Sequence, residues 1–165
     1  MDERTEEVLQ FWFGEIDELG RSSKECRKRW WTKSDAFDEE IKSQFLSDYE
    51  ATVEGHRESW RGTERGALAY ILVLDQFSRN MFRGTPMMFA ADDLARDACR
   101  ESLASGFDTR LSFDERVFLY LPLEHSEAMA DQLRSVEMFK QLLDRAPAPL
   151  EADAKYYLDF AVRHK

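Results

Sequence analysis

Apolar residues recur three and four positions apart along most of the chain, which is the spacing of one face of an α-helix. No run of alternating apolar and polar residues extends beyond a few positions, and no Asn-Gly or Asp-Gly hairpin turn occurs. Short loops between helices favour antiparallel neighbours. We therefore predict an all-α fold of stacked antiparallel helix hairpins, with about seven helices: 3–12, 34–53, 66–84, 85–103, 112–121, 123–143 and 153–164.

Polar residues that commonly cap helices stand at two of the predicted starts. Ser34 or Asp35 can accept hydrogen bonds from the unpaired amides of a first helical turn. Ser112 and Glu115 have the spacing of a capping box, in which each side chain accepts from the backbone of the other residue. These residues support the predicted boundaries at 34 and 112.

The segment from Gly66 to Gly84 places polar residues inside an otherwise apolar helix. Its first half, 67–74, is apolar enough to be buried on all sides, and its polar residues then share one face of a helical wheel. A solvated helix face usually consists of Lys and Glu, whereas the polar groups here make fixed, directional hydrogen bonds. We predict that they form a ligand-binding face, made of Asp75, Gln76, Arg79, Asn80 and Arg83.

An internal ion pair is also predicted on this helix. Asp75 and Arg79 are four residues apart with the acid first, which is the favourable orientation for such a pair. The alternative interpretation is that this pair and its neighbours tie adjacent helices together and bind nothing. Both interpretations stay open on the residues alone.

A second polar cluster lies in the segment 120–132, YLPLEHSEAMADQ. Pro122 should interrupt the helix there, because proline removes a backbone hydrogen bond and clashes with the preceding turn. If a continuous helix nevertheless runs past it, Glu124, Glu127 and Asp131 share one stripe, and His125 and Gln132 form the neighbouring stripe.

A histidine beside several carboxylates is suited to general-base catalysis with an orienting acid. The spacing matches no compact metal-binding motif, so we expect no metal ion and no cofactor. Alternatively, the histidine is a buried imidazole paired with one carboxylate. The catalytic candidates are His125, Glu124 and Glu127, and Asp131 and Gln132 join the predicted ligand-binding set.

Length and charge narrow the functional classes. A chain of 165 residues is long enough for one domain with a real core, and we assign residues 1–165 to a single helical domain. Its 33 acidic and 23 basic residues give a net charge of −10, which disfavours nucleic acid and anionic membrane surfaces as partners. Self-association through an exposed aromatic surface stays open, because the adjacent Trp30 and Trp31 cannot both face inward on a regular helix.

The N-terminal sequence favours a cytoplasmic location, and the two cysteines add no information to that prediction. Cys26 and Cys99 are far apart and outside any metal-ligand spacing, and reduced thiols are typical of cytoplasmic proteins. The first residues are acidic where a signal peptide would be basic. No apolar segment approaches the ~18 residues that a membrane-spanning helix needs.

Four ordered motifs resemble a bacterial family known as domain of unknown function 924. They are FWFG at 11–14, WW at 30–31 followed by Phe37-Asp38, LDQFSRNMFRGTP at 74–86 and YLPLEHSE at 120–127, and the resemblance covers nearly the whole chain. It implies an all-helical fold similar to tetratricopeptide repeats and no known activity. The matching polar residues of the family motifs are Asp75, Gln76, Arg79, Asn80, Arg83, Glu124, His125, Ser126 and Glu127, continued by Asp131 and Gln132.

The chain departs from the family pattern at two places. Members usually have proline where Ser78 stands, which alters the helix ending and leaves the polar face unchanged. They also typically continue past the helix ending at His164 into a short motif containing Phe, Gly, Arg, Pro, His and Asn, whereas this chain stops at Lys165. If that motif completes the site, the site here is truncated, diverged or dependent on another chain.

Three functional hypotheses follow. The first is a cytoplasmic helical-repeat-like protein that binds a small polar or anionic ligand, or a peptide, through Arg79 and Arg83, because arginine suits carboxylates and phosphates. The second is a hydrolase-type enzyme with His125 as base, Glu124 or Glu127 orienting it, and the arginines stabilising negative charge. The third is a protein-interaction scaffold whose polar network is structural.

Overall fold

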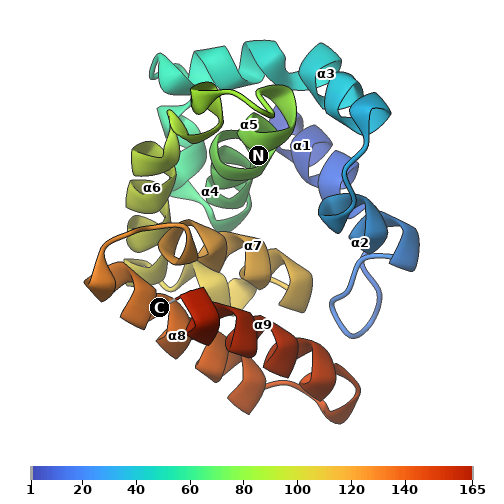
Figure 1. Cartoon of the computed structure of the whole chain (residues 1–165), viewed down its shortest axis with the longest axis vertical. Helices are drawn as coiled ribbons and strands as arrows, with labels where there is room; N and C mark the ends of the chain where they lie inside the picture. Colours follow the sequence, from blue (N-terminus) through green and yellow to red (C-terminus); the bar gives the residue numbers. More distant parts are fainter. Residues whose placement is uncertain (1, 165) are drawn as a thin grey trace.

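The computed structural model describes residues 2–164, and over these residues the chain is all α-helical, as predicted (Figure 1). Residues 1 and 165 of the predicted 1–165 domain lie outside the described residues. There is no strand between 2 and 164, only an isolated bridge between Ile16 and Ser22. The described residues form nine α-helices: α1 (Glu3–Phe13), α2 (Lys24–Trp31), α3 (Asp35–Val53), α4 (Glu64–Ile71), α5 (Ser78–Met81), α6 (Asp92–Ala104), α7 (Phe113–Glu124), α8 (Met129–Asp144) and α9 (Glu151–His164).

The difference from the expected seven helices has two sources. Helix α2 lies in a stretch of mixed basic and aromatic residues to which we assigned no helix, and Ser23 caps it by accepting from the Cys26 amide. The single helix predicted over 66–84 is divided into α4, a π-helical turn (Leu72–Phe77) and α5, which follow one another without a break. Short 3₁₀ turns connect most of the remaining helices, as at Pro86–Phe89 ahead of α6.

Helix α4 and the π-turn lie at the centre of the core. They contact α1, α3, α6 and α7, and every residue from Ala67 to Phe77 is buried. Aromatic rings from α1, α2 and α3 pack around Phe77 and Phe118. A π-turn is rare in proteins and is frequently found at functional sites, and this one contains Asp75 and Gln76.

The predicted caps are confirmed. Ser34 accepts from the Phe37 amide at the start of α3. Ser112 and Glu115 form the expected capping box at the start of α7. One tryptophan of the adjacent pair lines the surface, as expected: Trp31 is 55% exposed, whereas Trp30 is buried and donates to the Trp12 carbonyl.

The prediction that Pro122 interrupts its helix is wrong. Helix α7 continues through Pro122 and ends at Glu124. Proline removes only the bond from its own nitrogen to the Phe118 carbonyl in the preceding turn, and the helix ends two residues later at Glu124. The break comes instead at 125–128, between α7 and α8, so Glu124, Glu127 and Asp131 do not lie on one helical stripe.

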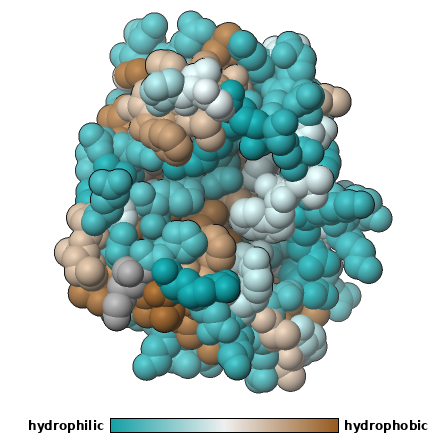
Figure 2. Space-filling model, viewed as in Figure 1, coloured by the Kyte–Doolittle hydropathy of each residue, from teal (hydrophilic) through white to brown (hydrophobic). Residues whose placement is uncertain are grey.

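The surface in Figure 2 is mainly hydrophilic, with hydrophobic side chains showing at its centre and along its lower left edge. Two of the larger exposed apolar side chains are on α8, Met129 and Leu133, and two are on α9, Tyr156 and Phe160. Between residues 2 and 164, no helix is both long and apolar enough to cross a membrane.

Candidate functional site

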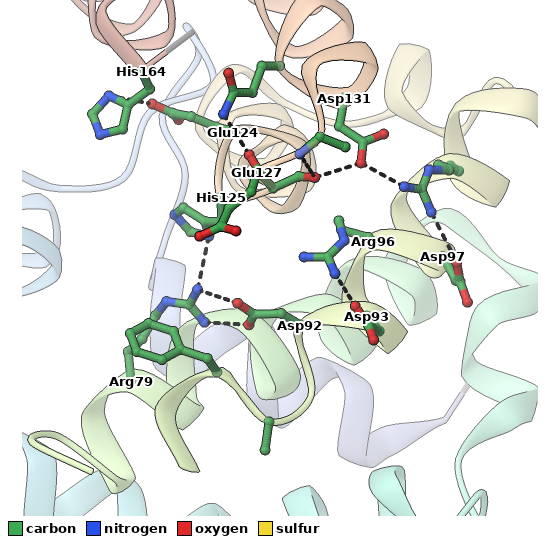
Figure 3. Close-up of a pocket in the computed structure, with 16 residues that line it drawn as sticks. Arg79, Asp92, Asp93, Arg96, Asp97, Glu124, His125, Glu127, Asp131 and His164 are labelled. Carbon is green, nitrogen blue, oxygen red and sulfur yellow. Dashed lines mark hydrogen bonds and ion pairs between the residues drawn. The ribbon is translucent and has the colours of Figure 1, made fainter. Parts of the chain in front are cut away.

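A cleft of about 1120 Å³ opens between the N-terminal half of α6 and the turn that joins α7 to α8 (Figure 3). Charged side chains make up most of its lining. Arg79 and Asp92 lie on one side of the cleft, with His125 and Glu127 across from them (Figure 3). The lining residues are Arg79, Phe89, Ala90, Asp92, Asp93, Arg96, Asp97, Arg100, Glu124, His125, Ser126, Glu127, Ala128, Asp131, Gln132 and His164.

His125 is held at this cleft by a buried carboxylate. It is the C-cap residue of α7, and its Nδ1 lies 2.9 Å from Oδ1 of Asp75 on the π-turn. The other oxygen, Oδ2, accepts from the side-chain amide of Gln76 at 2.8 Å. Asp75 is 1% exposed, whereas the His125 side chain is 28% exposed. The imidazole is therefore oriented from inside the core and opens toward solvent.

Burial and charge together set the protonation of this pair. Burial alone would raise the pKa of Asp75, but the nearby His125 and Arg79 outweigh it and lower that pKa below its ordinary value. Burial disfavours the imidazolium of His125, yet the Asp75 carboxylate more than compensates, so the pKa of His125 is raised. Asp75 is therefore ionised near neutral pH, and Nδ1 of His125 carries the proton that it donates to Asp75.

His125 Nε2 is the nitrogen left for a ligand. It makes no hydrogen bond to any residue between 2 and 164. Because it is not a buried atom either, a ligand can reach it. A histidine whose Nδ1 is held by a carboxylate keeps the tautomer in which a neutral Nε2 accepts a proton. This is the arrangement that a general base requires.

Arg79 supports the pair from the side and is already bound to carboxylates. Its Nη1 donates to the Asp75 carbonyl at 2.7 Å and lies 3.7 Å from Oδ1 of the same residue, which confirms the predicted ion pair. Both terminal nitrogens also donate to Asp92, at 2.9 and 3.0 Å. A guanidinium with these partners positions the carboxylates of Asp75 and Asp92. Because they neutralise its positive charge, it attracts an anionic ligand only weakly.

Asn80 and Arg83 do not reach the cleft. Asn80 donates to Asp38 on α3 at 2.8 Å, and Arg83 donates to both oxygens of the same carboxylate at 2.7 and 3.1 Å. Helix α5 ends at Met81, so Arg83 has left the helical wheel on which the shared face was predicted. The structure thus brings Asp75, Gln76 and Arg79 together with His125 and places Asn80 and Arg83 at a separate contact with α3.

The two glutamates predicted beside His125 occupy different environments. Glu124 is 4% exposed and its Oε1 has no hydrogen-bond partner among residues 2–164, whereas Glu127 lies on the exposed turn. Neither glutamate bonds to His125. The orienting carboxylate is Asp75, which the sequence placed in the ligand-binding set.

Asp131 and Gln132 line the opposite end of the cleft and hold the turn between α7 and α8 in place. Asp131 accepts from Ser126 and from Arg100, both at 2.7 Å. Gln132 donates to the Ser126 carbonyl at 2.8 Å. These bonds fix the turn that begins with His125.

Sequence reasoning missed the contribution of α6. Asp92, Arg96 and Arg100 recur four residues apart and face the cleft, with Asp93 and Asp97 beside them. The i,i+4 repeat of Asp, Arg and Arg was a usable signal. Within residues 2–164, no group of three or more His, Cys, Asp and Glu side chains is arranged to hold a metal ion.

Comparison with known proteins identifies the family. The family model described as bacterial protein of unknown function (DUF924) matches residues 8–165. A solved structure of ATU0120, a protein of unknown function from Agrobacterium tumefaciens, is 31% identical to this chain with a TM-score of 0.77, covering 98% of this chain and 84% of that one. Among curated proteins no match was found. The chain therefore belongs to the bacterial DUF924 family of proteins of unknown function, which confirms the family indicated by the four motifs.

Proposed function

We propose that this chain is a hydrolase-type enzyme in which His125, oriented by Asp75, acts as a general base on a small polar substrate bound in the cleft. The observation that carries the proposal is the 2.9 Å contact between a buried aspartate and a partly exposed histidine at the wall of a large cleft. The raised pKa of His125 makes its neutral imidazole a stronger base than a free histidine.

The proposed reaction is attack of water on an ester or amide carbonyl. His125 Nε2 takes a proton from the water as its oxygen bonds to the carbonyl carbon, and the carbonyl electron pair moves onto the carbonyl oxygen. When the tetrahedral intermediate collapses, the bond to the leaving group breaks and the imidazolium returns its proton to that group. Asp75 stays ionised throughout and stabilises the imidazolium.

The negative charge that develops on the carbonyl oxygen needs a hydrogen-bond donor that is not already bound to carboxylates. Arg96 meets this requirement better than Arg79. Arg79 is bound to Asp92 through two hydrogen bonds and contacts Asp75. Arg96 lines the cleft, and within the described part of the chain its one ion pair is with Asp93, a side chain that is 89% exposed. An exposed ion pair is weak, so Arg96 can turn toward an oxyanion at low cost.

We also propose that the fold is similar to tetratricopeptide repeats and that the protein is cytoplasmic. Helices α7, α8 and α9 contact one another in chain order, which supports a likeness to tetratricopeptide repeats. Cys26 and Cys99 are both free thiols, which supports a cytoplasmic location. The prediction that Arg79 and Arg83 bind an anionic ligand or a peptide stays a prediction, with both guanidiniums paired to carboxylates in the structure.

The test is turnover of L-alanine p-nitroanilide and p-nitrophenyl acetate by the wild type and the His125→Gln variant. His56→Gln is the matched control, because His56 is exposed and remote from the cleft lining. We expect His125→Gln to lower the rate by about 10²–10⁴-fold and His56→Gln to leave it unchanged. The wild-type rate should rise with pH through the pKa of His125. Equal rates for His125→Gln and the wild type, or no turnover by the wild type, would refute the proposal.

A further inference from the structure

Glu124 is a buried carboxylate whose negative charge has no hydrogen-bonded partner among residues 2–164. Its side chain is 2% exposed, it lines the cleft next to His125, and its Oε1 is buried without a hydrogen-bond partner among residues 2–164. The His164 imidazole lies beside it, with Nδ1 3.7 Å from Oε1, and that Nδ1 donates to the Phe160 carbonyl at 2.9 Å. Burial raises the pKa of Glu124.

Such a carboxylate weakens the fold, because a charge taken out of water needs a hydrogen-bonded partner to compensate for its lost hydration. A leucine at the same position would carry no such cost, and a neutral glutamine would carry a smaller one. Perturbed ionisable groups that face a cleft are typical of binding and catalytic sites. The position of Glu124 therefore indicates a partner that comes from outside the chain.

The remaining charges of the cleft show which sign that partner has. Each arginine in the lining is paired: Arg79 with Asp92, Arg96 with Asp93, and Arg100 with Asp97 and Asp131. Glu127 makes no ion pair within residues 2–164. The carboxylates left over, Glu124 and Glu127, give the cleft an excess of negative charge at the end where His125 lies.

We infer that the cleft takes an amine-bearing ligand and that Glu124 holds its ammonium group beside His125. The inference rests on the proposed function in naming the substrate class of the same site, an ester or amide that carries a free amine. An ammonium supplies hydrogen-bond donors that the Glu124 carboxylate lacks among residues 2–164, and ion pairing in a partly dehydrated cleft is stronger than in water. Bound in this way, the substrate would bring a carbonyl near the amine within reach of a water on Nε2.

The test is isothermal titration calorimetry with matched charged and neutral probes. The small-amine pair is 1,4-diaminobutane and 1,4-butanediol, and the peptide pair is L-alanyl-L-alanine and its N-acetyl form. The two pairs distinguish a free amine from a peptide N-terminus as the source of the ammonium. The variants are Glu124→Gln and, as a control with the same change in net charge, Glu137→Gln on the exposed face of α8.

We expect at least one amine probe to bind the wild type and its neutral counterpart to bind far more weakly. Glu124→Gln should weaken amine binding by about 10–100-fold, whereas Glu137→Gln should leave it unchanged. Because the amide removes a dehydrated charge, Glu124→Gln should also melt about 2–4 °C higher than the wild type at pH 8, which shows that the variant is folded. Equal binding by the two variants, or no binding of either amine by the wild type, would overturn the inference.

Failure of this inference and failure of the proposed function give different results. If amines bind through Glu124 and the wild type turns over neither chromogenic substrate, the inference holds and the proposed function fails. If turnover requires His125 but Glu124→Gln leaves amine binding unchanged, the proposed function holds and the inference fails. The His125→Gln variant should bind 1,4-diaminobutane within a few-fold of the wild type.

Discussion

The buried pair of Asp75 and His125 can be broken by Asp75→Asn, which changes the charge and hardly changes the shape. In the wild type each carboxylate oxygen accepts one hydrogen bond, from His125 on one side and from Gln76 on the other. An asparagine has one acceptor and one donor, so it can satisfy only one of these two donors. The other would face an amide NH₂ in a site that is 1% exposed.

The expected cost follows from these contacts. A buried donor without a partner costs about 1–3 kcal/mol, and a hydrogen bond to a charged group contributes about 1.5–3 kcal/mol. We therefore expect Asp75→Asn to lower the free energy of unfolding by about 3–5 kcal/mol, the range typical of a broken buried ion pair. For a chain of this length, each 1 kcal/mol lowers the melting temperature by about 2–4 °C. The variant should still fold, because native proteins are stable by about 5–15 kcal/mol.

The cost should depend on pH in a direction set by His125. Its pKa is raised in the folded protein, so its pairing with Asp75 stabilises the fold fully below the unfolded pKa, near 6.5. That contribution is lost as the pH rises through the raised folded pKa. The destabilisation caused by Asp75→Asn should therefore be larger at pH 6 than at pH 9, with about 1.4 kcal/mol of difference for each unit by which Asp75 raises the pKa of His125.

The assay is urea denaturation of the wild type and Asp75→Asn at both pH values. Asp38→Asn is the matched control, because Asp38 also accepts from two side chains but is more exposed and has no histidine partner. The control should lose about 1 kcal/mol, equally at both pH values. A loss of under about 0.5 kcal/mol for Asp75→Asn would mean that the buried contact is energetically negligible. A loss that is equal at pH 6 and pH 9 would show that His125 is not its charged partner.

Two further substitutions test the packing and the boundary of the cleft. Gly66→Ala should lower the free energy of unfolding, measured by urea denaturation, by about 3 kcal/mol or more, because the added Cβ would lie 2.2 Å from the Trp60 carbonyl oxygen. Gly62→Ala is the control: its added Cβ has nothing within 4 Å, so it should lower that free energy far less. Equal losses for the two variants would contradict the packing. Arg83→Ala should cost under about 1 kcal/mol, because its ion pair with Asp38 is partly exposed, and it should leave calorimetric binding of 1,4-diaminobutane unchanged; a loss of binding of tenfold or more would place Arg83 in the site.

The fold class and the polar residues within the core could be predicted from the sequence because both depend on local patterns. Helical spacing gave the all-α class, capping residues gave the starts of α3 and α7, and the i,i+4 spacing gave the Asp75–Arg79 pair. Polar residues in an apolar helix also indicated correctly that the centre of the core is polar at Asp75. Each of these features is decided within a few residues of the chain.

The partners within the site could not be predicted, because they depend on how helices pack. A uniform wheel of 100° per residue cannot represent the π-turn at Leu72–Phe77 or the end of α5 at Met81. It therefore grouped Arg83 with Arg79, although packing against α3 gives Arg83 a different carboxylate. Similarly, the choice of Asp75 over Glu124 as partner of His125 is made by the contact between α7 and the π-turn.

The central claim is that Asp75 holds His125 as a titratable group at the wall of the cleft, and NMR titration of the imidazole tests it most directly. The chain has three histidines, and His125→Gln identifies the resonance that belongs to His125. We predict a pKa above the ordinary value of 6.5 in the wild type and a lower pKa in Asp75→Asn. A wild-type pKa at or below 6.5, or one that Asp75→Asn leaves unchanged, would contradict the account.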